Sequence, residues 1–231
     1  MRKLIIWVRD SWADPLERLA MKGIVFVVLW SLAWAVALSY CSSAHAQPAA
    51  DVPRAALQHR ALLIRTSHAV WGLDAPVAVF AAQIHQESAW RPGAVSHVGA
   101  QGLAQFMPAT ARWIATTDPA LAANTPFNPA WAMRALVAYD LHLYGRVPAR
   151  FGSFDRMWLA LRGYNGGEGH WRAEGATTGL RAPTRQQIDA ACGQARRARV
   201  HCRENLGYPQ RILVVIQPRY ASWGRTLEPG A

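Results

Sequence analysis

The feature that most constrains the fold is a succession of segments in which apolar residues recur at helical spacing. In residues 54–71, for example, Leu57, Leu62, Ile64 and Val70 stand among polar residues. This three-to-four-residue spacing is typical of helices with one buried face. The predicted helices cover residues 54–71, 76–88, 108–114, 128–144, 154–164, 183–191 and 208–217.

The breaks between these segments carry helix-start and helix-stop residues. Pro76 and Pro108 stand where prolines commonly open helices, and Asn165-Gly166-Gly167 stands where a helix ends. The apolar run at 212–216 has strand propensity, but its helical surroundings favour a final helix. Because strands and helices do not alternate, the sequence predicts one mostly α domain.

Residues 21–47 have the pattern of a secretory signal peptide. Lys22 supplies a positive charge, residues 23–38 are largely apolar, and residues 44–46 (AHA) form a cleavage site. We expect residues 1–46 to be an extension and signal, with the start at Met1 or at Met21. Cleavage near Ala46 predicts a periplasmic or secreted protein. The alternative is an uncleaved membrane anchor, although the apolar stretch is short for a spanning helix.

The cysteines fit an exported protein. Cys41 would be removed with the signal peptide. It does not fit a lipoprotein signal, because Tyr40 stands before it where such a signal requires a small residue. Cys192 and Cys202 remain as an even pair, which predicts a disulfide that closes a small loop near the C-terminus. That loop is rich in arginine. It is either a solvated basic hairpin or a contact for anionic wall or lipid.

Composition narrows the function mainly by exclusion. The net charge of +11 carries little weight, because Lys3 and Lys22 are the only lysines and the arginine and alanine content is typical of a GC-rich genome. No nucleic-acid-binding motif is present. The histidines lack metal-ligand spacing, and there is no nucleophile elbow or phosphate-binding loop. The sequence therefore predicts no metal, no cofactor and no nucleic-acid partner.

Glu87 is the carboxylate with the most informative position. In the predicted helix 76–88, Val77, Phe80 and Ile84 define an apolar face, and Glu87 falls on that face while Gln83 lies elsewhere. A carboxylate on a buried face acquires either a raised pKa or a dedicated partner. A carboxylic acid that stays protonated near neutral pH can act as a general acid. The alternative is a glutamate that reaches solvent at the helix end.

Four segments in order carry a resemblance to a known family. They are Glu87-Ser88, then Ser96 followed by GAQGLAQFMPAT at 99–110, then GYNGG at 163–167, and finally Glu204 four residues before Tyr208. This set resembles the soluble lytic transglycosylase (SLT) family, which has a lysozyme-like helical domain. The resemblance covers about residues 75–220. It implies a catalytic cleft in that domain, flanked by a tether and helix at 47–74 and a tail at 221–231.

The resemblance also implies roles for individual residues. Glu87 would protonate the glycosidic oxygen and then act as base on the 6-hydroxyl of the same N-acetylmuramic acid (MurNAc), which gives a 1,6-anhydro end without water. One carboxylate would then suffice, and none of the remaining aspartates, Asp140 included, is nominated as a second one. The implied substrate-binding residues are Ser96, Gln105, Met107, Tyr164, Asn165 and Tyr208.

Peptidoglycan glycan strands are accordingly the expected partner and a lytic transglycosylase the expected activity. A hydrolytic muramidase that uses water is one alternative. The other is a non-catalytic wall-binding scaffold in a secretion, conjugation or phage assembly. A membrane contact is expected only through an uncleaved signal segment.

Overall fold

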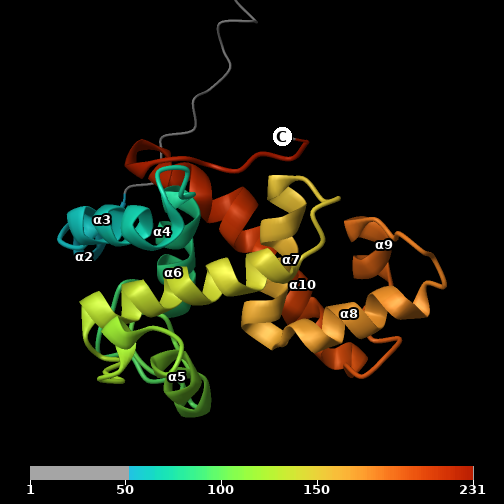
Figure 1. Ribbon diagram of the computed structural model, residues 1–231, viewed down its shortest axis with the longest axis horizontal. Helices are drawn as coiled ribbons and strands as arrows, with labels where there is room; N and C mark the ends of the chain where they lie inside the picture. The colour runs from blue at the N-terminus through green and yellow to red at the C-terminus, as the bar shows by residue number, and fades with distance from the viewer. Residues whose placement is uncertain (1–51, 231) are drawn as a thin grey trace, which may run out of the picture. The chain divides into compact units, whose positions relative to one another are not determined.

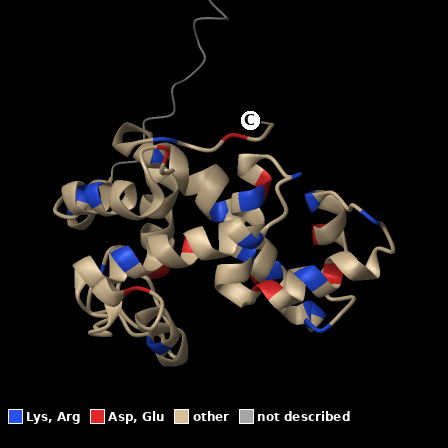
Figure 2. Ribbon diagram, viewed as in Figure 1, with Lys and Arg blue, Asp and Glu red and all other residues tan. Residues whose placement is uncertain are grey.

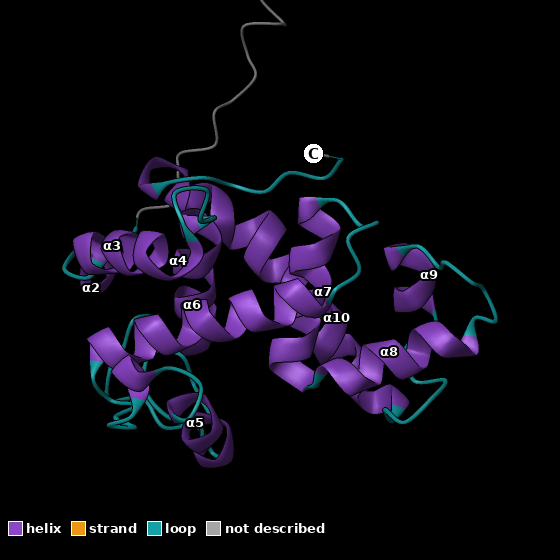
Figure 3. Ribbon diagram, in the orientation of Figure 1, coloured by secondary structure: helices purple, strands orange, loops and turns teal. Residues whose placement is uncertain are grey.

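A computed structural model describes residues 52–230, which belong to a compact unit covering Ala49–Ala231. The predicted extension, signal segment and cleavage site lie outside the described residues. Within residues 52–230 the regular structure is helical apart from isolated β-bridges in the loop at 95–106, as Figure 3 shows. The predicted mostly α class is confirmed. No helix among these residues is long and apolar enough to cross a membrane.

Most helices follow one another along the chain with short connections, but a long loop at residues 89–107 joins α4 to α5 (Figure 1). The α-helices are α2 (Arg54–Leu57), α3 (Arg60–Trp71), α4 (Val77–Ser88), α5 (Pro108–Ala115), α6 (Pro129–Arg146), α7 (Ser153–Gly166), α8 (Glu168–Thr177), α9 (Arg185–Ala190) and α10 (Cys202–Gln210). Short 3-10 helices form η1 (Pro119–Leu121), η2 (Arg199–His201) and η4 (Gln217–Trp223), and η3 (Arg211–Ile216) is a π-helix that continues α10.

The predicted helices are present, with three differences. The segment at 54–71 is divided into α2 and α3. Helix α8 was not predicted, because its glycine-rich sequence has little apolar periodicity; Gly167, at φ 84°, turns the chain directly from α7 into it. Helix α10 begins at Cys202, well before the predicted start at residue 208, and its early turns are polar. Apolar periodicity alone gives no signal for any of these three features.

Helix α4 lies at the centre of the core. Every residue from Val77 to Ile84 is buried, so this helix is covered on all sides rather than along one face. It packs against α3, η3 and η4, while α7 packs against α6, α8 and α10. The prediction that Gln83 lies away from the buried face is therefore wrong, because Gln83 is fully buried. A central helix of this kind holds its C-terminal turn, which carries Glu87, in a fixed place.

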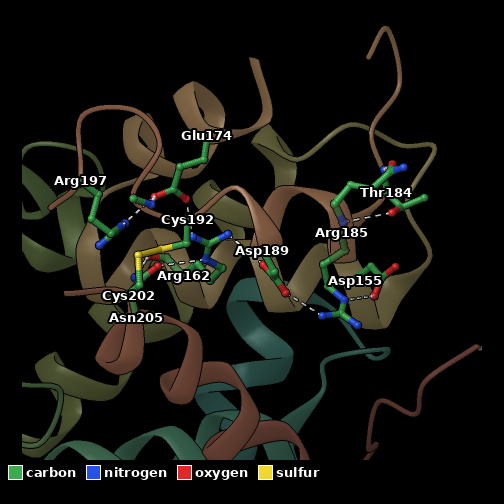
Figure 4. Close-up of polar contacts among 12 residues, drawn as sticks. Asp155, Arg162, Glu174, Thr184, Arg185, Asp189, Cys192, Arg197, Cys202 and Asn205 are labelled. Carbon is green, nitrogen blue, oxygen red and sulfur yellow. Dashed lines mark hydrogen bonds and ion pairs between the residues drawn. A yellow bond between two sulfur atoms is a disulfide. The ribbon is translucent and has the colours of Figure 1, made fainter. Parts of the chain in front are cut away.

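A buried ionic network joins α7 to α8, α9 and the loop that precedes α10 (Figure 4). Arg162 is fully buried and contacts Glu174 Oε2 at 2.5 Å and Asp189 Oδ1 at 2.9 Å. Arg197 Nε contacts Glu174 Oε1 at 3.1 Å. Removing one partner from such a network leaves an uncompensated buried charge, which costs about 3–5 kcal/mol. The network therefore fixes α7, α8, α9 and the loop before α10 relative to one another.

The predicted disulfide between Cys192 and Cys202 is confirmed. It closes the loop between α9 and α10 beside the ionic network (Figure 4). The arginines of this loop divide into two kinds: Arg197 is buried against Glu174, whereas Arg196 and Arg199 are exposed. The loop is thus partly a structural element of the core and partly a basic surface.

Candidate active site

Glu87 projects from the last turn of α4 into a cleft of 750 Å³. The helix ends abruptly because Ala89 and Trp90 adopt left-handed backbone conformations, at φ 50° and 63°. The carboxyl group is partly buried between α4 and α10. The residues that line the cleft are Gln86, Glu87, Asn165, Val200, Arg203, Glu204, Gly207, Tyr208 and Arg211.

The surroundings of Glu87 favour its protonated form. Burial is the largest influence and raises the pKa of Glu87 from 4.5 to about 7; the hydrogen bond from Tyr208 opposes this rise, and the negative charge of Glu204 adds to it. The Tyr208 hydroxyl donates to Glu87 Oε1. Both the protonated and the ionised carboxyl are therefore populated near neutral pH, as a group that gives and later takes a proton requires.

Two stacked tyrosines lie near Glu87; Tyr208 lines the cleft, whereas Tyr164 is not part of the cleft lining. The rings of Tyr164 and Tyr208 are stacked at 6.4 Å, and the Tyr164 hydroxyl donates to the Ala104 carbonyl at 2.7 Å. Burial, together with the negative charge of Glu87, raises the pKa of both hydroxyls well above the ordinary value. Both side chains therefore remain neutral hydrogen-bonding groups near neutral pH.

Asn165 lies in the same cleft and is oriented by buried neighbours. Its Oδ1 accepts from Asn205 Nδ2 at 3.1 Å, and its Nδ2 donates to Glu204 Oε1 at 3.4 Å. Asn205 is almost fully buried and in turn accepts from Arg162 Nε at 2.9 Å. A Cβ on Gly166, the last residue of α7, would lie 2.5 Å from Arg197 Nη1 and 2.7 Å from Asn205 Nδ2, so a larger residue there would displace these side chains. The ionic network thus reaches the cleft through Asn205.

The remaining predicted substrate-binding residues lie on the loop at 95–107, outside the cleft lining. Ser96 Oγ accepts from the Ala100 amide at 3.0 Å, and Gln105 Nε2 donates to the carbonyls of Gly102 at 2.8 Å and Ala94 at 3.2 Å. Ser96 and Gln105 therefore use these groups to hold the loop. Met107 is 43% exposed and presents an apolar surface. The cleft itself brings together Glu87, Asn165 and Tyr208.

Besides Glu204, a carboxyl group inside the core interacts electrostatically with Glu87. Asp140 of α6 is fully buried and accepts from Gln83 Nε2 at 3.4 Å, while its Oδ2 has no hydrogen-bond partner among the described residues. Burial, followed by the charge of Glu87, raises the pKa of Asp140 well above its ordinary value. Sequence reasoning did not single out Asp140 for a role. Asp140 follows Met133 and Leu136 at helical spacing, the same signal that marked Glu87.

One group of potential metal-ligand atoms occurs among residues 52–230. It joins Glu174 to Cys192 and Cys202. Both sulfur atoms are already bonded to each other in the disulfide. This group is therefore a part of the structural network and has no place in the cleft.

Comparison with known proteins shows that the chain is similar to transglycosylase SLT domains. A family described as "Transglycosylase SLT domain" matches residues 68–185. "Membrane-bound lytic murein transglycosylase F" of Maricaulis maris is 38% identical over 92 residues, which are 40% of this chain and 19% of that protein. The protein of the same name from Alcanivorax borkumensis is 35% identical over 92 residues, 40% of this chain and 18% of that one. The chain thus matches less than a fifth of the length of these relatives.

A solved structure has a similar fold. The 70 kDa soluble lytic transglycosylase SLT70 from Escherichia coli superposes with a TM-score of 0.52 at 23% identity, over 73% of this chain and 25% of that one. At this level of identity the similarity concerns the fold. The predicted lysozyme-like helical domain, as found in the SLT family, is confirmed at that level.

Proposed function

The chain belongs to the transglycosylase SLT domain family, and we propose that it is an exported peptidoglycan lytic transglycosylase. It cuts the β-1,4 bond between MurNAc and N-acetylglucosamine (GlcNAc) without water and leaves 1,6-anhydro-MurNAc ends. The observation that carries the proposal is Glu87: a partly buried carboxyl with a pKa of about 7, held by Tyr208 in an open cleft.

Glu87 acts twice in the proposed reaction. Its protonated carboxyl gives the proton to the glycosidic oxygen as the bond from C1 of MurNAc to that oxygen breaks. The resulting carboxylate then takes the proton of the MurNAc 6-hydroxyl, whose oxygen bonds to C1. The proton is thereby returned to Glu87, and no water is consumed. A pKa near the working pH supports both steps.

Tyr208 and Asn165 orient the groups that react. Because Tyr208 donates to Oε1 of Glu87, the other carboxyl oxygen is the one that can carry the transferable proton. The Asn165 amide is fixed by Asn205 and is suited to bind an N-acetyl group of the substrate. Ser96, Gln105 and Met107 extend the proposed binding surface along the neighbouring loop, and Tyr164 extends it beside Tyr208.

A hydrolytic muramidase is the second candidate, and one observation favours it. Glycoside hydrolysis ordinarily uses two carboxyl groups, and Glu204 lines the same cleft as Glu87. Asp140 is less suited to activate water, because it is fully buried against Gln83. Transglycosylation remains the primary proposal because it needs one carboxyl group only, and Glu204 already accepts a hydrogen bond from Asn165.

The test is digestion of purified sacculi by the wild-type chain and by Glu87→Gln and Glu204→Gln variants. Mass spectrometry of the products should find 1,6-anhydro ends with the wild type and with Glu204→Gln, and no release with Glu87→Gln. Reducing MurNAc ends that depend on both glutamates would identify a hydrolase. Absence of any release by the wild type would support the scaffold role.

The location and partners of the chain are part of the same proposal. Signal cleavage near Ala46 would place it in the periplasm or outside the cell, and an uncleaved segment would anchor it in the membrane. Fractionation of cells followed by N-terminal sequencing distinguishes the two. A place in a secretion, conjugation or phage assembly should appear as co-purification with components of that assembly.

A further inference from the structure

Two arginines line the cleft on the same side of α10 and its continuation. Arg203, Gly207 and Arg211 are spaced four residues apart, so they follow one another along one face of the helix. Eight residues of helix separate the two arginine Cα atoms by about 12 Å. Tyr208, beside Gly207, reaches Glu87. The two positive charges therefore flank the stretch of α10 that faces the proposed reaction centre.

Neither arginine serves the structure. Arg203 and Arg211 are exposed, and within residues 52–230 neither forms an ion pair or side-chain hydrogen bond. Arg162 and Arg197 differ, because both are buried against Glu174. The free guanidinium groups are thus available to a ligand in the cleft.

The helix surface between the two arginines is open. Gly207 lines the cleft, and a Cβ added there would meet no atom within 4 Å. Among the described residues that line the cleft, Glu87 and Glu204 are the ones that carry carboxyl groups. Glu87 is largely protonated below a pH of about 7, and Glu204 accepts from Asn165. Below a pH of about 7, the residues that line the cleft therefore carry more positive than negative charge.

The positive surface continues beyond the cleft. A neighbouring hollow of 420 Å³ shares Asn165 and Glu204 with the cleft; of its two arginines, Arg196 is exposed, whereas Arg197 is paired with Glu174. Figure 2 shows basic residues along the loop that leads into α10. An anionic group that enters the cleft near Glu87 thus meets positive charge on the side of α10.

Peptidoglycan itself supplies suitable anions. Its sugar rings are neutral, whereas the stem peptides on the lactyl groups of MurNAc carry free carboxylates. Arginine binds carboxylates through paired, charge-assisted hydrogen bonds, and a neutral sugar gives no comparable contact. A glycan strand positioned for cleavage at Glu87 places the stem of the cut MurNAc beside the reaction centre.

We propose that Arg203 and Arg211 form a binding site for stem-peptide carboxylates, so that the enzyme prefers glycan strands that carry stems. This inference rests on the proposed function, because it assumes that the glycan strand occupies the cleft. The arginines select the substrate and take no part in the proton transfers of Glu87.

The test uses one pool of uncrosslinked glycan strands divided in two. One half keeps its stems, and the other is stripped by an N-acetylmuramoyl-L-alanine amidase. The rates of formation of 1,6-anhydro ends are measured as kcat/KM on both halves. The variants are Arg203→Gln, Arg211→Gln, the double variant, and Arg211→Lys, which keeps the charge. Arg65→Gln is the matched control, because Arg65 is exposed on α3 and lines neither hollow.

The wild type should prefer stem-bearing strands by about tenfold, and each glutamine substitution should reduce that preference by about two- to fivefold. In every arginine variant, kcat/KM on stripped strands should fall by a smaller factor than kcat/KM on stem-bearing strands. Arg211→Lys should keep most of the preference, and Arg65→Gln all of it. Added salt should weaken the preference, because exposed charges are screened.

Other results would overturn the inference in identifiable ways. Equal kcat/KM on both halves, or a preference that survives in the double variant, would refute the stem site and leave the proposed function intact. Loss of binding to anionic phospholipid vesicles in the double variant, with the cleavage preference unchanged, would assign the arginines to a membrane surface instead. A wild type that forms no anhydro ends on either half would refute the proposed function.

Discussion

Replacing Glu87 by glutamine should stabilise the folded chain at alkaline pH while it abolishes activity. Folding raises the pKa of this carboxyl from 4.5 to about 7. Between these values the folded chain binds one more proton than the unfolded chain, so the free energy of unfolding falls as pH rises through this window. The fall amounts to about 3 kcal/mol, since each pKa unit corresponds to roughly 1.4 kcal/mol.

The Glu87→Gln variant has no proton to lose and keeps an oxygen acceptor for Tyr208. Its free energy of unfolding should equal that of the wild type near pH 4 and exceed it by about 3 kcal/mol above pH 7. Urea unfolding across this pH range, with the disulfide intact, measures the difference. Glu228→Gln removes an exposed carboxylate on the C-terminal tail and serves as the control. Parallel stability curves for Glu87→Gln and the wild type would refute the reasoning that burial controls this carboxyl.

Three further predictions concern the neighbours of Glu87 and the disulfide. Tyr208→Phe removes a hydrogen bond that lowers the pKa of Glu87. The alkaline limb of the pH–rate profile should therefore move to higher pH, and the rate at neutral pH should fall about tenfold. An alkaline limb that does not move would contradict this prediction. The Tm of the Asp140→Asn variant should equal that of the wild type at acid pH and exceed it at alkaline pH. The reason is that burial raises the pKa of the Asp140 carboxyl, so that its ionisation destabilises the fold. A lower Tm of the variant at alkaline pH would show that the charge on Asp140 is tolerated. Replacing both Cys192 and Cys202 by serine should lower the free energy of unfolding, measured by urea titration, by about 3 kcal/mol. This is the value expected when a loop with a sequence separation of 10 is no longer closed by a disulfide. An unchanged free energy of unfolding would show that the ionic network alone holds the loop.

Much of the fold could be predicted from the sequence because local patterns determine it. The apolar spacing in residues 129–146 and the prolines at helix starts are properties of neighbouring residues, and the corresponding helices are present. The pairing of Cys192 with Cys202 was predicted from their even number in a chain that was expected to be exported, and the disulfide is present. Helix α8 was missed because it is stabilised by contacts of Trp171 and Glu174 with other helices, not by its own periodicity.

The site was predictable where a residue had a local signal. Glu87 stood out because a carboxylate followed apolar residues on a helix face. Gln83 was placed wrongly because periodicity does not distinguish a helix with one buried face from a helix buried all round. Asn205 and Arg162 had no signal at all, since their importance comes from contacts between helices 43 residues apart in the chain. The support of the cleft is therefore visible only in three dimensions.

The most direct test of the central claim follows the fate of water during cleavage. Glycan strands are digested by the wild-type chain in water enriched in oxygen-18, and the new MurNAc ends are examined by mass spectrometry. If the MurNAc 6-hydroxyl attacks C1 with Glu87 as acid and base, the new ends are lighter than hydrolysed ends by one water molecule and contain no oxygen-18. Incorporation of one oxygen-18 atom at each new end would contradict this account and identify a hydrolase.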